Sequence, residues 1–564
     1  VRRLTSGQWD ESLLKAILNN MKREQLQAMQ SNEQRAERFV DAFVAGQPWS
    51  DAVGELQRLD TLSKKTVTDC ARRYLTEGYG CVFKRQGIDA SAKKIDKPHI
   101  SPIETNRDKT SAFVDSVLAM PVAEVEPVFV DFSREVQKGT LMGGNELLAH
   151  RDVDSRLFHL SFVIERGTKE DPALDVAEQY LPYLGTDSMD ASQLQSRLYA
   201  LACDATLSTE AGRTRLTLSG LAENMEEALR LTERWIATAR PDTAIYAQVV
   251  NDILKLRADN KTNQKACFNA LTQYGIYGPH NAITDAMDTA RMRQLGAAGV
   301  LQHLRSLSGV AQHVLYYGPL ESTQVSRLVN EVHPMSEHPE AAHDGQFYTP
   351  LQVDESRVII APFQAKNTYM MGYSSRGEQF SLALQPYVGV FNEYFGGGMN
   401  SIVFQELRES RGLAYNASAL FSQASRPSDR EWFFTRIITQ NDKLKDCLNV
   451  FDEIVEQMPQ SESAFSLARE AVVKRLATQR ILREQILDYY LRCRDQGLDD
   501  DPDKAVYEKV KTMTMADLLS FHEREIAKRK YHLLLLGDEA DWDMSGLQQR
   551  GAIQRVTLKD IFGY

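Results

Sequence analysis

Residues 394–421 read YFGGGMNSIVFQELRESRGLAYNASALF, and this stretch indicates how the end of the chain folds. Three glycines at 396–398 form a turn, and a helix that carries Arg408 follows them. Gly412 stands where a left-handed residue ends a helix, and the residues after it alternate as in a strand. The pattern therefore places two hydrogen-bond donors close together in the sequence, Arg408 near a helix end and Tyr415 on the next strand.

The bulk composition is that of an ordinary globular protein. The chain has 564 residues, a formal charge of -11, 43% hydrophobic residues and 25% charged residues. This length predicts about three or four domains. The acidic balance disfavours nucleic acid as a partner, and no apolar run reaches the roughly 18 residues of a membrane-spanning helix. Six scattered cysteines without a CxxC pair favour buried free thiols and leave the redox compartment open.

One order of elements, a helix pair followed by a helix and a strand, occurs three times along the chain. The copies cover residues 10–87, 242–318 and 462–537, and the first is predicted to end in a strand at 79–84. Only the second and third copies have a front half of strands and helices. Three copies of one pattern indicate repeated modules, and we expect the chain to begin in the middle of one.

Three histidines recur every five residues at His333, His338 and His343. A metal site is one interpretation, since histidine is a common ligand. A solvated acidic linker is the favoured one, because Pro334 and Pro339 prevent a helix that would bring the three rings onto one face.

Two further motifs have a chemical and a structural interpretation. The glycines at 396–398 can cradle a phosphate at a helix N-terminus, but the Walker spacing is missing and a tight turn is favoured. The sequence His522-Glu523 is half of a zinc motif without its second histidine, and a helix surface is favoured there. Neither HExxH nor HxxEH occurs in the chain.

The segments GGGMNS, LRES and RGLAY within residues 396–415 together resemble the C-terminal modules of pitrilysin and insulin-degrading-enzyme type zinc metallopeptidases, the inverzincins of the insulinase family. In that family the arginine and tyrosine of this motif hold the peptide substrate. Spacing alone favours a surface salt bridge of Arg408 with Glu406 or Glu409 and an ordinary half-buried strand position for Tyr415, whereas the resemblance implies substrate binding by both. It also implies four modules around an enclosed chamber, with the zinc-binding HxxEH module first and outside this sequence.

The middle module resembles the zinc module without its chemistry. The segment VAEQYLPYLGT matches the place of the HxxEH helix, with Val176 and Tyr180 at ligand positions and Gln179 at that of the general base. Valine cannot bind zinc, and glutamine cannot take a proton from zinc-bound water. Arg197 matches Arg408, but the tyrosine position holds Asp204. We therefore expect an inactive copy, with no catalytic or metal-binding residue in this chain.

The repeats and the resemblance together give a domain plan. Residues 1–87 are the C-terminal half of a second module, and 88–140 are an interdomain linker. Residues 141–330 form a third module, 331–350 a second linker, and 351–564 a fourth module that carries the Arg–Tyr pair. The expected class is α+β, about two and a half modules of the LuxS and processing-peptidase type. Each full module is expected to be an antiparallel sheet with helices packed on one face.

The function implied by the resemblance is that of a non-catalytic part of a zinc metalloendopeptidase that degrades peptides or small unfolded proteins. Zinc would be bound outside this chain, by an N-terminal half of the same protein or by a separate catalytic subunit. A metal-free partner subunit or scaffold is the alternative, and a chaperone-like peptide binder is a third reading. The resemblance favours a bacterial periplasm or cell envelope without deciding the compartment.

Overall fold

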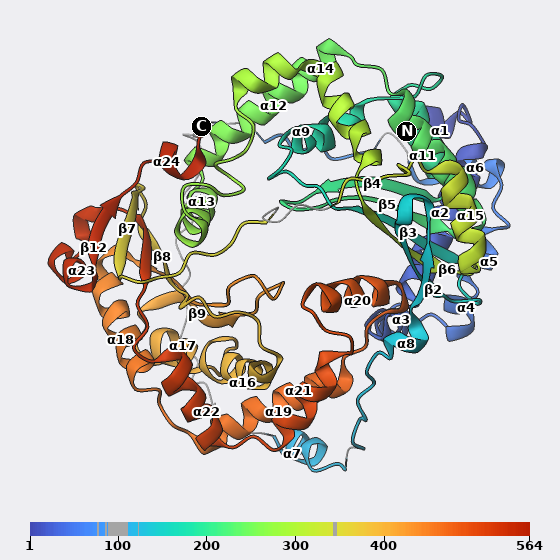
Figure 1. Cartoon of the computed structure of the whole chain (residues 1–564). Helices are drawn as coiled ribbons and strands as arrows, with labels where there is room; N and C mark the ends of the chain where they lie inside the picture. Colours follow the sequence, from blue (N-terminus) through green and yellow to red (C-terminus); the bar gives the residue numbers. More distant parts are fainter. Residues whose placement is uncertain (76–77, 85–86, 88–110, 122, 342–346) are drawn as a thin grey trace.

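A computed structural model contains two α+β units and a helical N-terminal segment (Figure 1). The expected α+β class is thereby confirmed. No helix in the parts of the chain described below is both long and apolar enough to cross a membrane. The structure describes residues 1–75, 78–84, 87, 111–121, 123–341 and 347–564.

The first unit is built on a six-stranded sheet with the order β1-β2-β6-β3-β5-β4. Its strands β2 and β6 are parallel, because a helical crossover returns β6 in the direction of β2, and the other neighbours are antiparallel. The sheet starts inside the stretch predicted as a linker. The strands are β1 (Gln137–Thr140), β2 (Glu146–Arg151), β3 (Leu157–Ile164), β4 (Cys203–Thr209), β5 (Thr214–Leu221) and β6 (Gln312–Gly318).

The second unit repeats this plan with the order β12-β7-β11-β8-β10-β9. Here β7 is parallel to both β11 and β12, so each sheet is mixed, and the expected purely antiparallel sheets are wrong. Strand β9, which follows Arg408, is the outermost strand of its sheet. The strands are β7 (Arg357–Pro362), β8 (Asn367–Ser374), β9 (Ala414–Ser422), β10 (Trp432–Gln440), β11 (His532–Gly537) and β12 (Ala552–Arg555).

Each unit packs most of its own helices against one face of its own sheet, as expected. In the first unit these are α9 (Ala173–Tyr180), α10 (Ala191–Ala200), α11 (Met225–Thr238), α12 (Thr243–Thr262), α14 (Thr289–Ser306) and α15 (Ser322–Val332). In the second unit they are α16 (Gln385–Phe391), α17 (Ile402–Phe404), α18 (Leu444–Glu456), α19 (Glu462–Thr478), α21 (Pro502–Lys511), α22 (Met515–Phe521) and α23 (Met544–Arg550).

The opposite face of each sheet is covered by a helix from the other unit. Helix α13 (Gln264–Tyr277) belongs to the first unit and packs Leu271 into the core behind the second sheet, together with the short C-terminal α24 (Leu558–Phe562). Helix α20 (Ile486–Asp495) belongs to the second unit and packs Leu487 behind the first sheet. The two units therefore exchange one helix each, and the exchange fixes how they sit against one another.

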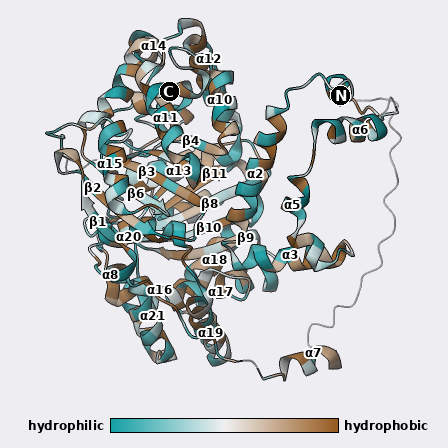
Figure 2. Ribbon diagram, turned by 90° about the vertical axis from the view of Figure 1, so that its right-hand side faces the viewer, coloured by the Kyte–Doolittle hydropathy of each residue, from teal (hydrophilic) through white to brown (hydrophobic). Residues whose placement is uncertain are grey.

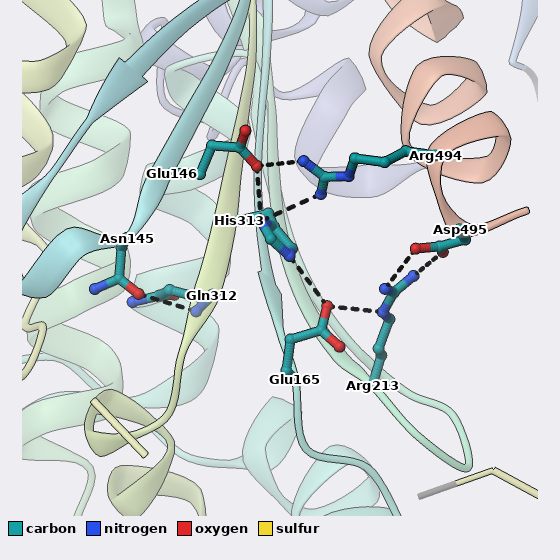
Figure 3. Close-up of polar contacts among 8 residues, drawn as sticks. All are labelled: Asn145, Glu146, Glu165, Arg213, Gln312, His313, Arg494 and Asp495. Carbon is teal, nitrogen blue, oxygen red and sulfur yellow. Dashed lines mark hydrogen bonds and ion pairs between the residues drawn. The ribbon is translucent and has the colours of Figure 1, made fainter. Parts of the chain in front are cut away.

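A chain of charged side chains ties α20 to the first sheet (Figure 3). On β6, His313 lies between two carboxylates, with Nδ1 3.1 Å from Glu146 and Nε2 3.4 Å from Glu165. Arg494 of α20 donates to Glu146, and Arg213 joins Glu165 to the last residue of α20, Asp495. The hydrogen bond from His313, and after it Arg494, lower the pKa of Glu146 from 4.5 to about 2.

The lowered pKa makes the junction sensitive to acid. A carboxylate whose pKa is lower in the folded state stabilises the fold above its unfolded value, and that contribution is lost as the pH falls through its folded value. Stability should therefore drop between pH 4.5 and about 2. Glu146→Gln should be less stable than the unchanged chain at pH 7, and the difference should shrink through this range in urea unfolding curves. The exposed control Glu337→Gln should match the unchanged chain throughout. A constant difference for Glu146→Gln would contradict this account.

The N-terminal segment consists of helices and is joined to the first unit through α2. Asn20 of α2 donates to the carbonyl oxygen of Tyr199 at 2.7 Å. The predicted strand at 79–84 is wrong, since residues 78–84 form no strand. A strand forms only where its backbone groups can pair with those of a neighbouring strand. The helices here are α1 (Arg2–Thr5), α2 (Ser12–Ala28), α3 (Asn32–Val44), α4 (Trp49–Val53), α5 (Glu55–Leu59) and α6 (Lys64–Tyr74), and the next in the chain are α7 (Ala112–Leu118) and α8 (Phe132–Glu135).

Two histidines lie in surroundings that differ from those expected. His333 is buried rather than solvated, because it follows the last residue of α15 and its ring contacts Glu233 at 2.7 Å and Gln312 at 3.2 Å. His522 is buried near the rings of Phe391 and Phe395 rather than on a helix surface. His338 is exposed, as a linker residue would be, and His343 lies outside the described residues.

Candidate functional site

Arg408 is presented by a π-helical segment, Gln405–Ser410, that continues α17. The hydroxyl of Ser401 accepts a hydrogen bond from the Phe404 backbone and begins the helix. Gly412, at a φ of 57°, follows the helix in the left-handed conformation that the sequence predicts. The π-helical turn is an uncommon feature that often accompanies functional sites. It leaves the Arg408 side chain 44% exposed.

Tyr415 lies at an irregularity of the outermost strand. Along β9 and β10 the paired residues run in step until Ile438 faces Asn416, whereas the next residue, Thr439, faces Ala414. Tyr415 is the extra residue of this bulge. A bulge redirects a side chain out of the regular alternation. Regular alternation from the buried Ala417 would place Tyr415 on the buried face, whereas the Tyr415 side chain is 80% exposed.

The structure brings the two predicted residues together. The Arg408 guanidinium carbon lies 5.9 Å from the centre of the Tyr415 ring and 4.8 Å from that of Phe404. Arg408 forms a surface ion pair with Glu409, 3.7 Å from Nε, while Glu406 pairs with Arg411. A planar cation and a phenol, both exposed, thus stand side by side and offer several donors to a ligand with carbonyl or carboxylate oxygens.

Sequence reasoning missed Phe404, on which the Arg408 guanidinium rests. The signal was present, because residues four apart lie on the same face of a helix and an aromatic ring attracts a cation. The bulge at Tyr415 left no comparable signal, since it depends on how β9 pairs with β10.

The glycine turn before α17 is a place of close backbone approach. A Cβ atom on Gly396 would lie 2.0 Å from the carbonyl oxygen of Ala419 on β9, whereas a Cβ on Gly398 would come no nearer than 3.6 Å to Glu393. Gly396 therefore lets the end of the π-helical segment Asn392–Gly396 touch the strand that carries Tyr415. This observation supports the tight-turn interpretation.

Gly396→Ala should accordingly push the turn away from β9 and destabilise the second unit by about 1–3 kcal/mol. Gly398→Ala is the matched control, and it should unfold at the same urea concentration as the unchanged chain. Equal unfolding midpoints for both variants would refute the close approach.

The corresponding positions of the first unit are occupied differently. Arg197, on α10, forms an ion pair with Glu227. Asp204, on the outermost strand β4, pairs with Arg23 of α2 at 2.7 Å. The tyrosine position of the first unit thus holds an acid that is paired with an arginine, so the pair of Arg408 and Tyr415 is not repeated at these two positions.

The helix expected to match a zinc-binding helix does not fit zinc. Val176 and Tyr180 of α9 are buried in the core, and the Tyr180 hydroxyl donates to the Asp242 carbonyl oxygen at 3.0 Å. Gln179 contacts Asp175 of the same helix. Across the described ranges, no group of three or more His, Cys, Asp or Glu side chains could hold a metal ion.

Comparison with known proteins gives a family for part of the chain. The model of the peptidase M16 inactive domain matches residues 310–472, which include Arg408 and Tyr415. No curated protein sequence matches the chain.

Solved structures show that the fold is shared more widely. A peptidase M16 inactive domain from Pseudomonas fluorescens has a TM-score of 0.59 at 17% identity, over 72% of this chain and 98% of that one. A protease from Helicobacter pylori has a TM-score of 0.54 at 12% identity, over 73% and 100%. The ferredoxin protease FusC, solved with Arabidopsis ferredoxin, has a TM-score of 0.60 at 9% identity. The match covers 90% of this chain and 58% of that chain.

These likenesses, at 9–17% identity, show a shared fold. The family model confirms the expected resemblance at the level of the family for residues 310–472. Residues 310–472 are therefore identified as matching the inactive domain of the peptidase M16 family.

Proposed function

We propose that this chain is the non-catalytic, substrate-binding part of a zinc metalloendopeptidase that degrades peptides or small unfolded proteins in an enclosed chamber. The observation that carries the proposal is the exposed Arg408–Tyr415 pair on a module of the inactive M16 type. The zinc site is assigned to an N-terminal half outside this chain. The proposed compartment is the bacterial periplasm or cell envelope.

Arg408 and Tyr415 would act by holding backbone oxygens of the substrate. A guanidinium donates through a planar fork, and a phenol adds one further hydrogen bond. Donors aimed at an oxygen that gains negative charge during the reaction lower the barrier, because the charge is then met by preformed dipoles. The outermost position of β9 also fits an extended peptide lying along the strand.

The proposal is tested first on the isolated chain. After incubation with zinc and removal of free metal, it should hold less than one zinc ion per chain by elemental analysis. It should also cleave no unfolded protein or fluorogenic peptide. Stoichiometric zinc together with cleavage by the isolated chain would overturn the proposal.

A metal-free partner subunit of a two-chain peptidase is the second candidate. Such a subunit would bring the Arg408–Tyr415 pair to a separate zinc-bearing chain. The coding sequence upstream of Val1 separates the candidates. An HxxEH motif in the same reading frame supports one polypeptide, whereas a start codon at Val1 with a separate peptidase gene beside it supports two.

A further inference from the structure

The first unit contains a small cavity between its sheet and helices α11, α14 and the end of α15. Its volume is about 260 Å³, and its apolar wall includes Leu216 of β5, Ile236 of α11 and Leu304 of α14. Leu216 and Leu304 are buried, whereas Ala237 and Pro334, which also line the cavity, are exposed, so it opens to solvent. In Figure 2, α14 and α15 lie on the side of the first unit away from the N-terminal helices α3, α5 and α6.

The size and the lining of this cavity fit a small molecule with an apolar body. An apolar cavity of about 150 Å³ holds benzene, and sites for drug-sized ligands begin at about 300 Å³. A volume of about 260 Å³ therefore has room for one branched aliphatic or aromatic group and a few polar atoms. In such sites the few polar groups of the wall decide which ligand is bound.

An acidic side chain in the wall has one unpaired acceptor oxygen. Glu233 of α11 is 8% exposed, and its Oε1 contacts Nδ1 of His333 at 2.7 Å. The His333 ring is held in place by Gln312 at 3.2 Å and by stacking on Phe162. Within the part of the chain that the structure describes, the other oxygen of Glu233, Oε2, has no hydrogen-bond partner. A buried oxygen of this kind favours a ligand that donates to it, because leaving it unpaired costs free energy.

A guanidinium in the same wall has an unpaired donor nitrogen. Arg305 of α14 donates from Nε to the carbonyl oxygen of Ile236 at 3.0 Å and from Nη2 to that of Ala239 at 2.6 Å. These bonds hold the Arg305 side chain against the end of α11. Its third nitrogen, Nη1, has no partner among the described residues. The wall therefore offers a cationic donor as well as an anionic acceptor, and neighbouring groups already hold both in place.

The second unit has the same ion pair but a different cavity. Asp452 of α18 stands at the same distance from the start of its helix as Glu233 and pairs with Arg550, the last residue of α23. The cavity beside it, of about 220 Å³, has the cations Lys528 and Arg529 in its wall. The ion pair thus belongs to the plan of both units, whereas the apolar cavity beside it belongs to the first.

We infer that the cavity of the first unit binds an apolar α-amino acid such as leucine. The ammonium group donates to Oε2 of Glu233, the carboxylate accepts from Nη1 of Arg305, and the apolar side chain lies against Leu216 and Leu304. This arrangement pairs both charged groups of the ligand and removes its side chain from water. Peptide hydrolysis supplies ligands of this class, so the site is compatible with the proposed function without resting on it.

The ligand chemistry is tested on the unchanged chain by isothermal titration calorimetry. 4-Methylpentanoic acid lacks the ammonium group of leucine, and 3-methylbutylamine lacks its carboxylate. Each should bind at least about tenfold more weakly than leucine, because each leaves one charge-assisted hydrogen bond unmade. Glycine, which has no apolar side chain, should also bind at least about tenfold more weakly. No binding of leucine at about 10 mM, or equal affinity for leucine and both analogues, would overturn the inference.

Two variants test where leucine binds. Ile236→Trp fills the cavity and should abolish leucine binding, whereas the control Leu256→Trp, at an exposed position of α12, should leave it unchanged. Glu233→Gln keeps the shape of the side chain and removes its charge. It should weaken leucine binding at least about tenfold and leave the affinity for 4-methylpentanoic acid unchanged, since that analogue has no ammonium group. A purely structural role of Glu233 would weaken both ligands alike.

Hydrogen exchange gives the location without any substitution. Leucine should slow exchange in α11 and α14 of the unchanged chain, and this measurement decides the location if Ile236→Trp does not fold. Protection confined to other segments, or leucine binding that survives Ile236→Trp in a folded variant, would refute the site. None of these measurements needs a zinc-bearing half, so their failure leaves the proposed function standing.

Discussion

Replacing Arg408 with alanine is expected to lower kcat/KM of the proposed peptidase complex about a hundred- to a thousandfold, a loss of roughly 2.7–4 kcal/mol in transition-state stabilisation. The expected size follows from the loss of a charged, planar donor at an exposed position beside Tyr415. Peptide hydrolysis by the complex of this chain with its zinc-bearing half is the measurement. Tyr415→Phe removes one hydroxyl and keeps the ring, so it should reduce kcat/KM in the same direction.

The matched control is Arg197→Ala. Arg197 occupies the corresponding helix position of the first unit, is similarly exposed and is paired with Glu227. Its loss should change kcat/KM little. If Arg408→Ala and Tyr415→Phe both retain full activity, the assigned site is wrong, whatever the fold. If Arg197→Ala has the same effect as Arg408→Ala, the specific role of the second unit is refuted.

Removing one buried leucine from either exchanged helix is expected to destabilise the chain by about 2–5 kcal/mol. Leu487 on α20 is 2% exposed behind the first sheet, and Leu271 on α13 is fully buried behind the second. Leu487→Ala and Leu271→Ala each leave a cavity between a helix of one unit and the sheet of the other. Urea unfolding followed by circular dichroism measures the loss.

The exposed Leu256 serves as control, since Leu256→Ala should change the free energy of unfolding by less than about 0.5 kcal/mol. A second readout distinguishes the exchange from ordinary packing. Each of the two buried variants should increase proteolysis at both units together, because each helix closes the core of the unit to which it does not belong. Loosening confined to one unit would contradict the exchange.

Much of the fold could be predicted because its patterns are local. The helix pairs and the strand of the second and third repeats follow from apolar periodicity and from end signals such as Asp242, whose side chain caps α12. The strand predicted at 79–84 failed because it rested on the repeat, and a strand's stability comes from neighbours that the pattern does not contain. The mixed sheet order depends on crossover geometry, which periodicity does not record.

The sequence contains a signal of the helix exchange that our prediction did not use. Residues 533–536 are four consecutive leucines in β11, and all four are buried. A strand that is apolar at every position is covered on both faces, whereas a sheet with helices on one face alternates. The sequence pattern therefore indicates that the second face of the sheet is covered, although it does not identify the helix that covers it.

The candidate site, like the fold, could be predicted only in part. The short separation of Arg408 and Tyr415 around Gly412 predicted that the two side chains lie close together, because a helix stop followed directly by a strand leaves little room between them. The outward direction of Tyr415 was beyond prediction, since a regular strand would place alternate residues on opposite faces and the bulge changes this locally.

Peptide cleavage by the separated and recombined parts tests the central claim most directly. This chain, the zinc-bearing half and an equimolar mixture are compared on one unfolded substrate at the same concentration. The account predicts no cleavage by this chain, weak or no cleavage by the zinc-bearing half, and strong cleavage by the mixture, which Arg408→Ala lowers about a hundred- to a thousandfold. Cleavage by the zinc-bearing half that the addition of this chain does not increase would contradict the account.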